Sequence, residues 1–500
     1  PYHVHRAPRN VLILNAATGT QILQARYYEI PAIDAVEPDP RLGGLIKGPY
    51  SDYFDWPALE TSLRLHAVSS RGFAANKHRF DLVQLGLPGA STGGASGTDS
   101  LAGAYDHTVE AIQSYLKLLE ADGMLVITAW SDTPARGSLK LFVTAVEAMR
   151  NSGITEPQHN IAWIRSWNTS TLLLKNSALS AEETSRVRDF SQSRNFDLAW
   201  IPGIREQDTN RYQRLPRPVF FMAAQSTFHD PDQRFISNYP YDIGAATDDA
   251  PFLNHYFKWS QVPALLAQPL QSTISAIGVA FPTLILTLLL ALLSSLVLIV
   301  LPLFFLPSGN ASADGSRRRV LIFFLCIGLG FLFIELAFIE KLSLILSHPI
   351  YAVAVTLCAF LIFSGLGSLY VQRCTRGDMH ALHSRVLKPS IVTIIIIAMI
   401  YTQLIPVTSS LLMSLSLPTR LAATFLLAAP LAFAMGMPFS IGLAALQQRY
   451  PQLVPWAWGI NGCASVVSAI LAVLLAIEIG FSGVMLCAAL LYLLAWLNRV

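Results

Sequence analysis

A strand, a turn of small residues and an acid after the next strand form the first candidate site in this chain. The apolar run Asn10–Leu14 leads into the turn Asn-Ala-Ala-Thr-Gly at 15–19, and Glu37 follows a second apolar run, Ala32–Val36. A turn without bulky side chains lets a ligand approach the backbone, and a carboxylate about 20 residues further on can accept hydrogen bonds from ribose hydroxyls. The pattern predicts a nucleoside-binding turn, with a purely structural turn as the alternative.

A second candidate site is a group of charges at one end of an apolar segment, and it comprises Glu335, Glu340 and Lys341. At about 1.5 Å per residue, a helix that starts near 320 places Glu340 and Lys341 at the far membrane interface and Glu335 inside the hydrocarbon. Five residues of helix turn the two acids about 140° apart, so they do not share a face. Glu335 therefore needs a partner on another helix or a proton. Contact with an ion, proton or substrate and a structural hydrogen bond between helices remain alternatives.

The composition indicates a membrane protein with one water-soluble half. Of the 500 residues, 53% are hydrophobic and 13% are charged, which is too apolar for a single soluble protein. Most charges precede residue 259, and 259–313 contains no Asp, Glu, Lys or Arg. A net charge of +3 without a basic run argues against a nucleic-acid partner. The five cysteines have no ligand-like spacing, so no metal site is expected.

These observations predict three regions: an α/β domain at 1–258, a linker or interfacial segment at 259–277, and a membrane domain at 278–500. A bilayer crossing needs about 20 apolar residues, so the membrane domain should contain about seven transmembrane helices. We place them at 278–304, 320–341, 350–371, 390–407, 419–443, 457–477 and 482–497. The expected location is a bacterial inner (plasma) membrane, with the lipid bilayer as the main partner. The oligomeric state is not predicted.

The soluble half alternates between strand-like and helix-like segments. Further strands are expected at 63–68, 81–85 and 124–128, with helices at 21–28, 105–119 and 138–151. Such alternation is typical of a doubly wound, Rossmann-like parallel sheet, which binds ligands at the carboxyl ends of its strands. Near the end of this half, Asp248 and Asp249 precede a run of aromatic residues. They are interpreted either as a functional acidic pair or as a helix-capping turn before an interfacial anchor.

The side of the membrane that the soluble half faces is left open. The Lys and Arg residues flanking spans two to seven fall on one side if the spans alternate, and the positive-inside rule makes that side cytoplasmic. If 278–304 crosses once, residues 1–258 lie outside the cytoplasm. If the apolar run 262–307 instead enters and returns, they lie inside it.

The whole arrangement resembles the spermidine synthase family, and more specifically its membrane-fused branch. This resemblance covers nearly the full chain and is carried by VLILNAATGTQILQARYYEIPAIDAVEPDPRL, FDLVQLGLPGA and AYDHTVEAIQSYLKLLEADGMLVIT in the first half, and by ATDDAPFLNHYFKW, GLGFLFIELAFIEKLSLILSHPIYAV, GMPFSIGL and WAWGINGCASVVSAILAVLLA in the second. It implies a methyltransferase-like fold and S-adenosylmethionine or its decarboxylated form as cofactor. The implied reaction is aminopropyl transfer to a polyamine or other small amine.

The resemblance also assigns site residues. It matches the cofactor-binding positions with Asn15, Ala17, Gly19, Glu37 and Ser70, of which only Glu37 carries the acid that the family uses. Active members carry aspartates just after the fourth strand, where this chain reads Leu-Gly-Leu-Pro-Gly at 85–89. An amine nucleophile must lose a proton before it attacks, and these residues cannot accept one.

The catalytic residues are therefore unknown, and the nearest candidates are Asp99 and Asp106. Each could fold over the site, or be an ordinary solvated acid or a cap on the next helix. Whether the domain is an enzyme is uncertain. The favoured interpretation is a membrane-bound, spermidine synthase-like transferase with a degenerate active site. The alternative is a non-catalytic sensor or scaffold domain fused to a transporter-like membrane unit.

Overall fold

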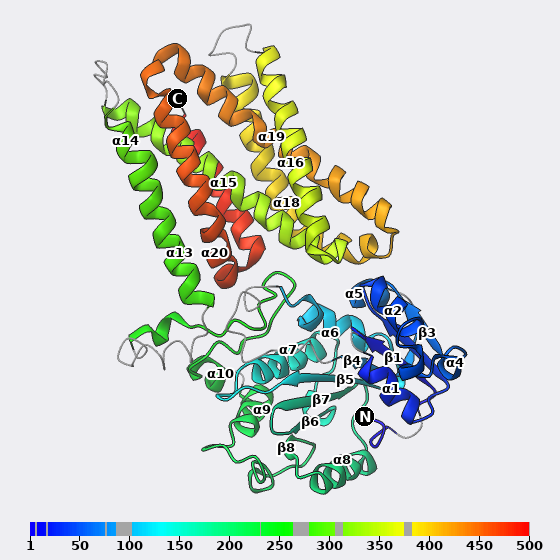
Figure 1. Cartoon of the computed structure of the whole chain (residues 1–500). Coiled ribbons are helices and arrows are strands. Elements are labelled where there is room, and N and C mark those ends of the chain that lie inside the picture. Colours follow the sequence, from blue (N-terminus) through cyan, green and yellow to red (C-terminus); the bar gives the residue numbers. More distant parts are fainter. Residues whose placement is uncertain are drawn as a thin grey trace. The chain divides into compact units, whose positions relative to one another are not determined.

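A computed structural model divides the chain into two compact units, Pro1–Phe281 and Pro282–Val500 (Figure 1). It describes residues 1–5, 8–16, 19–75, 78–86, 103–230, 232–263, 280–305, 314–374 and 383–499. The boundary lies later than the expected end of the first domain at 258. Phe281 belongs to the first unit because its ring stacks on Phe257, with 4.1 Å between centroids, and meets Trp259 edge-on at 5.7 Å.

The first unit is built on an eight-stranded mixed sheet with the order β3-β2-β1-β4-β5-β7-β6-β8. Its first five strands run parallel, and β7, β6 and β8 continue the sheet in antiparallel pairs. The strands are β1 (Asn10–Leu14), β2 (Ala32–Val36), β3 (Leu63–His66), β4 (Phe80–Leu85), β5 (Leu119–Trp130), β6 (Ile161–Arg165), β7 (Thr169–Lys175) and β8 (Asp197–Trp200).

Helices follow the parallel strands, as the sequence pattern predicts. Helix α1 packs on β1 and β2, α6 and α7 on β5, and α8 and α9 on β8. The helices are α1 (Thr20–Tyr27), α2 (Pro40–Lys47), α3 (Ser51–Phe54), α4 (Trp56–Leu59), α5 (Ser70–Ala74), α6 (Val109–Leu116), α7 (Gly137–Asn151), α8 (Ala181–Ser193), α9 (Val219–His229) and α10 (Arg234–Asn238). The Rossmann-like class is confirmed, and the antiparallel β6–β8 extend the all-parallel sheet that the sequence suggested.

The register of the central strands decides which residues meet at the edge of the sheet. Strand β1 consists mainly of Val, Leu and Ile and is completely buried from Val11 to Leu14. This is expected of a central parallel strand that is covered on both faces. Leu14 pairs with Val36 on one side and with Leu85 on the other. Asn15, Glu37 and Gly86, which follow these three residues, therefore leave the sheet at the same carboxyl edge.

The second unit is helical. Its helices are α13 (Ala280–Ser295), which continues through a π-helix (Leu296–Val300) into α14 (Leu301–Leu303); α15 (Asp314–Leu346); α16 (Pro349–Cys374); α18 (Lys388–Met413), preceded by a π-helix (His383–Leu387); α19 (Leu417–Arg449); and α20 (Val454–Leu497). Within the described residues, six helices are long and apolar enough to cross a membrane. Residues 280–303 form an uninterrupted helix that contains no return.

Helix α20 contains two of the expected spans. Its 44 residues would extend about 66 Å, more than twice the thickness of a hydrocarbon core. At Gly480 the backbone leaves the helix, with φ 72° and ψ 168°, a combination that essentially only glycine adopts. The expected spans 457–477 and 482–497 lie on either side of this break. A total of seven crossings stays a prediction.

Glycines bring the backbones of α16 and α19 into contact. A Cβ added at Gly367 would overlap the carbonyl oxygen of Phe433, and one added at Gly436 would overlap that of Ser364. Close approach through small residues is a common basis of helix packing in membranes, where no hydrophobic effect drives helices together. Gly365 differs from these two glycines, because a Cβ added there meets no atom within 4 Å.

We expect Gly367→Ala to destabilise the helical unit, because its methyl group must push α16 away from α19. The matched control is Gly365→Ala, two residues earlier in the same helix and open to free space. Overpacking of this kind costs roughly 1–3 kcal/mol. The measurement is the apparent melting temperature of the full chain in detergent, which should fall for Gly367→Ala only. Equal melting temperatures for the two variants would contradict the contact.

Candidate functional site

Three residues expected at the site are joined by hydrogen bonds at the edge of β1. Ser70 Oγ donates to Asn15 Oδ1 at 2.8 Å, and Asn15 Nδ2 donates to Asp106 Oδ2, also at 2.8 Å. Asn15 itself has a left-handed backbone conformation, with φ 51°, in which Asn is one of the residues best tolerated. The candidate acid Asp106 therefore reaches the first residue of the nucleoside-type turn, although 91 residues separate them in sequence.

Asp106 is neither a solvated loop acid nor the cap of the next helix. The cap of α6 is Thr108, whose hydroxyl accepts a hydrogen bond from Ala111 N. The second oxygen of Asp106 accepts from Tyr115 OH at 3.1 Å. Burial, together with the Asp106 carboxylate, raises the pKa of Tyr115, so this phenol stays a proton donor at neutral pH. The Asp106 carboxylate is thus held by Asn15 and Tyr115 and remains partly exposed.

A cavity of about 200 Å³ lies beside the turn, and the predicted ribose acid lines it together with the turn. Ala16 and Glu37 form one wall, at the ends of β1 and β2, and α2 forms the other with Gly43 and Gly44. Glu37 Oε1 accepts a hydrogen bond from Asp39 N at 3.2 Å, which orients its carboxylate.

His66, at the end of β3, also lines this cavity. Its Nε2 lies 2.6 Å from Asp34 Oδ1 on β2, which fixes the ring position. Glu37, which follows β2, and His66, at the end of β3, therefore line the same cavity as the turn. An acid, a histidine and small residues at a carboxyl edge can bind a ligand that carries hydroxyl groups and a flat ring.

Gly19 is needed for packing as well as for backbone conformation. It precedes α1 with φ 77°, and the Cβ of any other residue would overlap the ring of Phe54. The remaining two predicted residues, Ala17 and Asp99, lie outside the described residues.

The end of β4 borders a second cavity, of about 270 Å³, on one face of the sheet. Its polar lining includes the imidazole of His3 and the amide and hydroxyl groups of Gln84, Thr128, Thr171 and Ser166. Two of these threonines, on β5 and β7, share a hydrogen bond of 3.1 Å. Among the described residues that line this cavity there is no Asp or Glu. Residues 87–89, where the family's aspartates are expected, lie outside the described residues.

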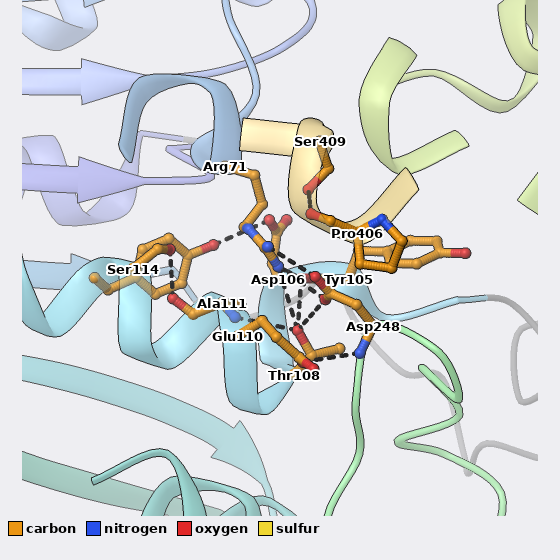
Figure 2. Close-up of polar contacts among 11 residues, drawn as sticks. Arg71, Tyr105, Asp106, Thr108, Glu110, Ala111, Ser114, Asp248, Pro406 and Ser409 are labelled. Carbon is orange, nitrogen blue, oxygen red and sulfur yellow. Dashed lines mark hydrogen bonds and ion pairs between the residues drawn. The ribbon is translucent and has the colours of Figure 1, made fainter. Parts of the chain in front are cut away.

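A buried ion pair holds the segments around Asp106 together (Figure 2). Arg71 on α5 donates from both terminal nitrogens to the two oxygens of Asp248, at 2.9 and 2.8 Å. The hydroxyl of Thr108 donates to Asp248 at 2.6 Å, and Asp248 N donates to Glu110 Oε2 at 2.8 Å. Arg71 also donates to the carbonyl of Tyr105, the residue before Asp106.

The electrostatics of this cluster favour a charged Arg71 and disfavour extra negative charge. Burial opposes the charge of Arg71, but the hydrogen bonds and the carboxylate of Asp248 hold its pKa above the ordinary value. Burial, together with the charge of Asp248, raises the pKa of Glu110. No helix begins in the described residues after Asp248 before Trp259, so the helix-capping interpretation of this acid is wrong; it is an ion-pair partner.

The membrane charges lie on the single helix α15. Glu335 is buried and makes no hydrogen bond or ion pair within the part of the chain that the structure describes. Lys341 is also buried, and its Nζ donates to Ser482 Oγ on α20 at 3.0 Å. Because α15 is continuous from Asp314 to Leu346, Glu335 and Glu340 lie on different faces, as expected. Lys341 thus contributes to contact between two helices.

The sequence did not single out Arg71, Thr108 or Tyr115. Arg71 stands in a short helix without a motif, and its partner is 177 residues away. The only signal was the acidic pair at Asp248 and Asp249. Thr108 could have been recognised as a helix cap, since Thr before an apolar-periodic segment is a usual start signal.

Comparisons with known proteins found similarity at the level of structure only. No family model matches the chain, and no curated protein matches it. Human methyltransferase-like protein 13 in complex with SAH is 13% identical, with a TM-score of 0.27, over 38% of this chain and 84% of that one. Spermidine synthase from Thermotoga maritima is 15% identical, with a TM-score of 0.28, over 47% and 71%. A spermidine synthase bound to the transition-state analogue AdoDATO is 14% identical, with a TM-score of 0.25, over 47% and 71%.

We expect Arg71→Met and Asp248→Asn each to destabilise the α/β unit, because each leaves a charge or a polar network without its partner in a buried place. Removing one member of a buried pair costs about 3–5 kcal/mol. The double variant should lose less than the sum of the two single losses. The measurement is the apparent melting temperature of the full chain for all four proteins.

The matched control is Arg234→Met, which breaks a pair whose side chains are 76% and 68% exposed and which should therefore change little. Strictly additive losses would show that Arg71 and Asp248 do not act as a pair.

Proposed function

We propose that the α/β unit is a nucleoside-sulfonium-binding domain of the transferase type, with S-adenosylmethionine or its decarboxylated form as cofactor and a degenerate acceptor site. The observation that supports this proposal best is the cavity lined by both Ala16 of the turn and Glu37, which follows β2. Its position at the carboxyl ends of adjacent parallel strands is where open α/β sheets bind ligands. The hydrogen-bonded group Asn15, Ser70 and Asp106 stands at the same edge.

A bound sulfonium would supply an electrophilic carbon for transfer. The residues of this chain would bind the cofactor and accept the proton. Glu37 would accept hydrogen bonds from the ribose hydroxyls, and the absence of large side chains at Ala16 would leave room for the nucleoside. Asp106, held by Asn15 and Tyr115, would accept the proton that an amine loses on attack. Arg71 and Asp248 would act as positioning residues, because they hold the segment that carries Asp106.

The acceptor would differ from a typical polyamine. A polycation needs nearby anions, yet no Asp or Glu stands among the described residues that line the cavity beside β4. This chemistry suits a small amine or another weakly charged acceptor better than a long polyamine. For that reason the acceptor site is called degenerate, and polyamine transfer by the usual mechanism is not part of the proposal.

We expect calorimetry on the full chain in lipid nanodiscs to detect binding of S-adenosylmethionine or its decarboxylated form, and Glu37→Ala to weaken it. Loss of a hydrogen bond to a charged group costs about 1.5–3 kcal/mol, or roughly 10- to 100-fold in affinity. Glu37→Gln should be intermediate, since it keeps an oxygen for Asp39 N and removes only the charge. Glu60→Gln, at an exposed glutamate outside the cavity, is the control. No heat at millimolar ligand would contradict cofactor binding.

The proposal also makes a prediction about topology, because S-adenosylmethionine is a cytosolic metabolite. Trypsin added to spheroplasts of a bacterial host should leave residues 1–258 intact, and cleavage should require permeabilisation. A single crossing at residues 280–303, combined with the positive-inside rule, gives the opposite orientation. Cleavage in intact spheroplasts would therefore contradict the transferase proposal and favour the alternative of a sensor or scaffold domain on a transporter-like unit.

A further inference from the structure

A cavity of about 420 Å³ lies inside the helical unit, between α15, α16, α19 and α20. Its volume falls within the range of about 300–1,000 Å³ that small-molecule sites usually occupy. Two of its margins, Leu361 and Trp458, are 71% and 56% exposed, so the cavity opens on the surface of the bundle. In a membrane, a molecule dissolved in the lipid phase could enter through that opening.

One glycine in the lining of the cavity leaves open space beside it. Gly365 borders it, and a Cβ added there meets no atom within 4 Å. This contrasts with Gly367 and Gly436, whose missing side chains are used for contact between α16 and α19. The helices therefore touch at one glycine pair and leave a gap beside it.

Several polar residues that line this gap have side-chain groups without a hydrogen-bond partner among the described residues. Tyr492 is only 1% exposed, and its hydroxyl makes no hydrogen bond with any residue that the structure describes. The same holds for the side-chain amide of Asn461 and the hydroxyl of Ser364. Ser368 and Ser440 satisfy each other across the two helices at 2.7 Å. Burying a polar group in hydrocarbon without a hydrogen bond costs several kcal/mol. A bound molecule that forms hydrogen bonds with these groups would remove that cost.

The residues that line the cavity also indicate the charge of its ligand. Among the described residues that border the cavity there is no Asp, Glu, Lys, Arg or His. Glu335 lies one helical turn beyond Phe331 on α15 and is not part of the lining. An ion entering such a site would lose its hydration without gaining a counter-ion, which is highly unfavourable. The aromatic rings of Phe331, Phe439 and Trp458 instead offer contact to an apolar body.

We propose that this cavity binds an uncharged, lipid-soluble molecule with a carbonyl or hydroxyl group. That group would hydrogen-bond with Tyr492, Asn461 and Ser364, and the rest of the molecule would pack against the aromatic rings. The proposal concerns the helical unit alone and does not depend on cofactor binding by the α/β unit.

Benzophenone is a suitable probe, because it is uncharged, carries one carbonyl and forms covalent adducts on illumination. With the full chain in nanodiscs, adducts mapped by mass spectrometry should concentrate on peptides from α16 and α20 that contain Ser364 and Tyr492. Gly365→Leu places a side chain in the open space and should lower the yield there roughly tenfold, equivalent to about 1.4 kcal/mol of binding. Trimethylammonium and carboxylate derivatives of the probe should give little adduct at these peptides.

The matched control is Gly462→Leu on α20, where an added Cβ also meets no atom within 4 Å but which does not border the cavity; it should leave the yield unchanged. Tyr492→Phe removes only the hydroxyl without a partner, so it should fold normally and still label less. Even labelling of all outward-facing helices, unaffected by Gly365→Leu and Tyr492→Phe, would overturn the proposal. Equal labelling by the charged derivatives would also overturn it.

Discussion

The ion pair between Arg71 and Asp248 is the interaction on which the site in the α/β unit depends. It joins α5, which follows β3, to a segment near the end of the unit, and through Thr108 it includes the start of α6. The loop before α6 carries Asp106, and that loop is fixed from both sides: by Arg71 at the carbonyl of Tyr105 and by Asn15 at the carboxylate. A buried pair of this kind is weak evidence for net stability, but its geometry specifies one arrangement of three distant segments.

Buried polar groups are paired differently in the two units. In the α/β unit, charges that leave water find charged or hydrogen-bonding partners, as Lys175 does between Asp122 and Glu183. In the helical unit, the backbone is satisfied within each helix, and contact depends on small residues such as Gly367 and Gly436. Exceptions to these rules mark the places with functional interest. In the helical unit they are Glu335 and the hydroxyl of Tyr492, both of which are buried and have no hydrogen-bond partner among the described residues.

Much of the fold was predictable from the sequence because its signals are local. The buried runs at β1 and β2, the turn between them and the long apolar helices all follow from periodicity and length. The position of Glu37 beside the turn follows as well, since adjacent parallel strands end at the same edge. The antiparallel β6–β8 were not predicted: short apolar strands carry no sign of their direction, and strand pairing is decided by contacts far apart in sequence.

The sequence by itself determined the two-part architecture, the edge of the sheet where Asn15 and Glu37 emerge, and the membrane helices with their embedded charges. Only the tertiary structure decided which acid reaches that edge. It joined Asp106 to Asn15 and Asp248 to Arg71, whereas the other candidate acid, Asp99, lies outside the described residues. It also separated Gly365, which faces open space, from Gly367, which touches another helix. Hydrogen bonds and close contacts depend on distances of a few ångströms between elements, and no local pattern of residue types encodes such distances.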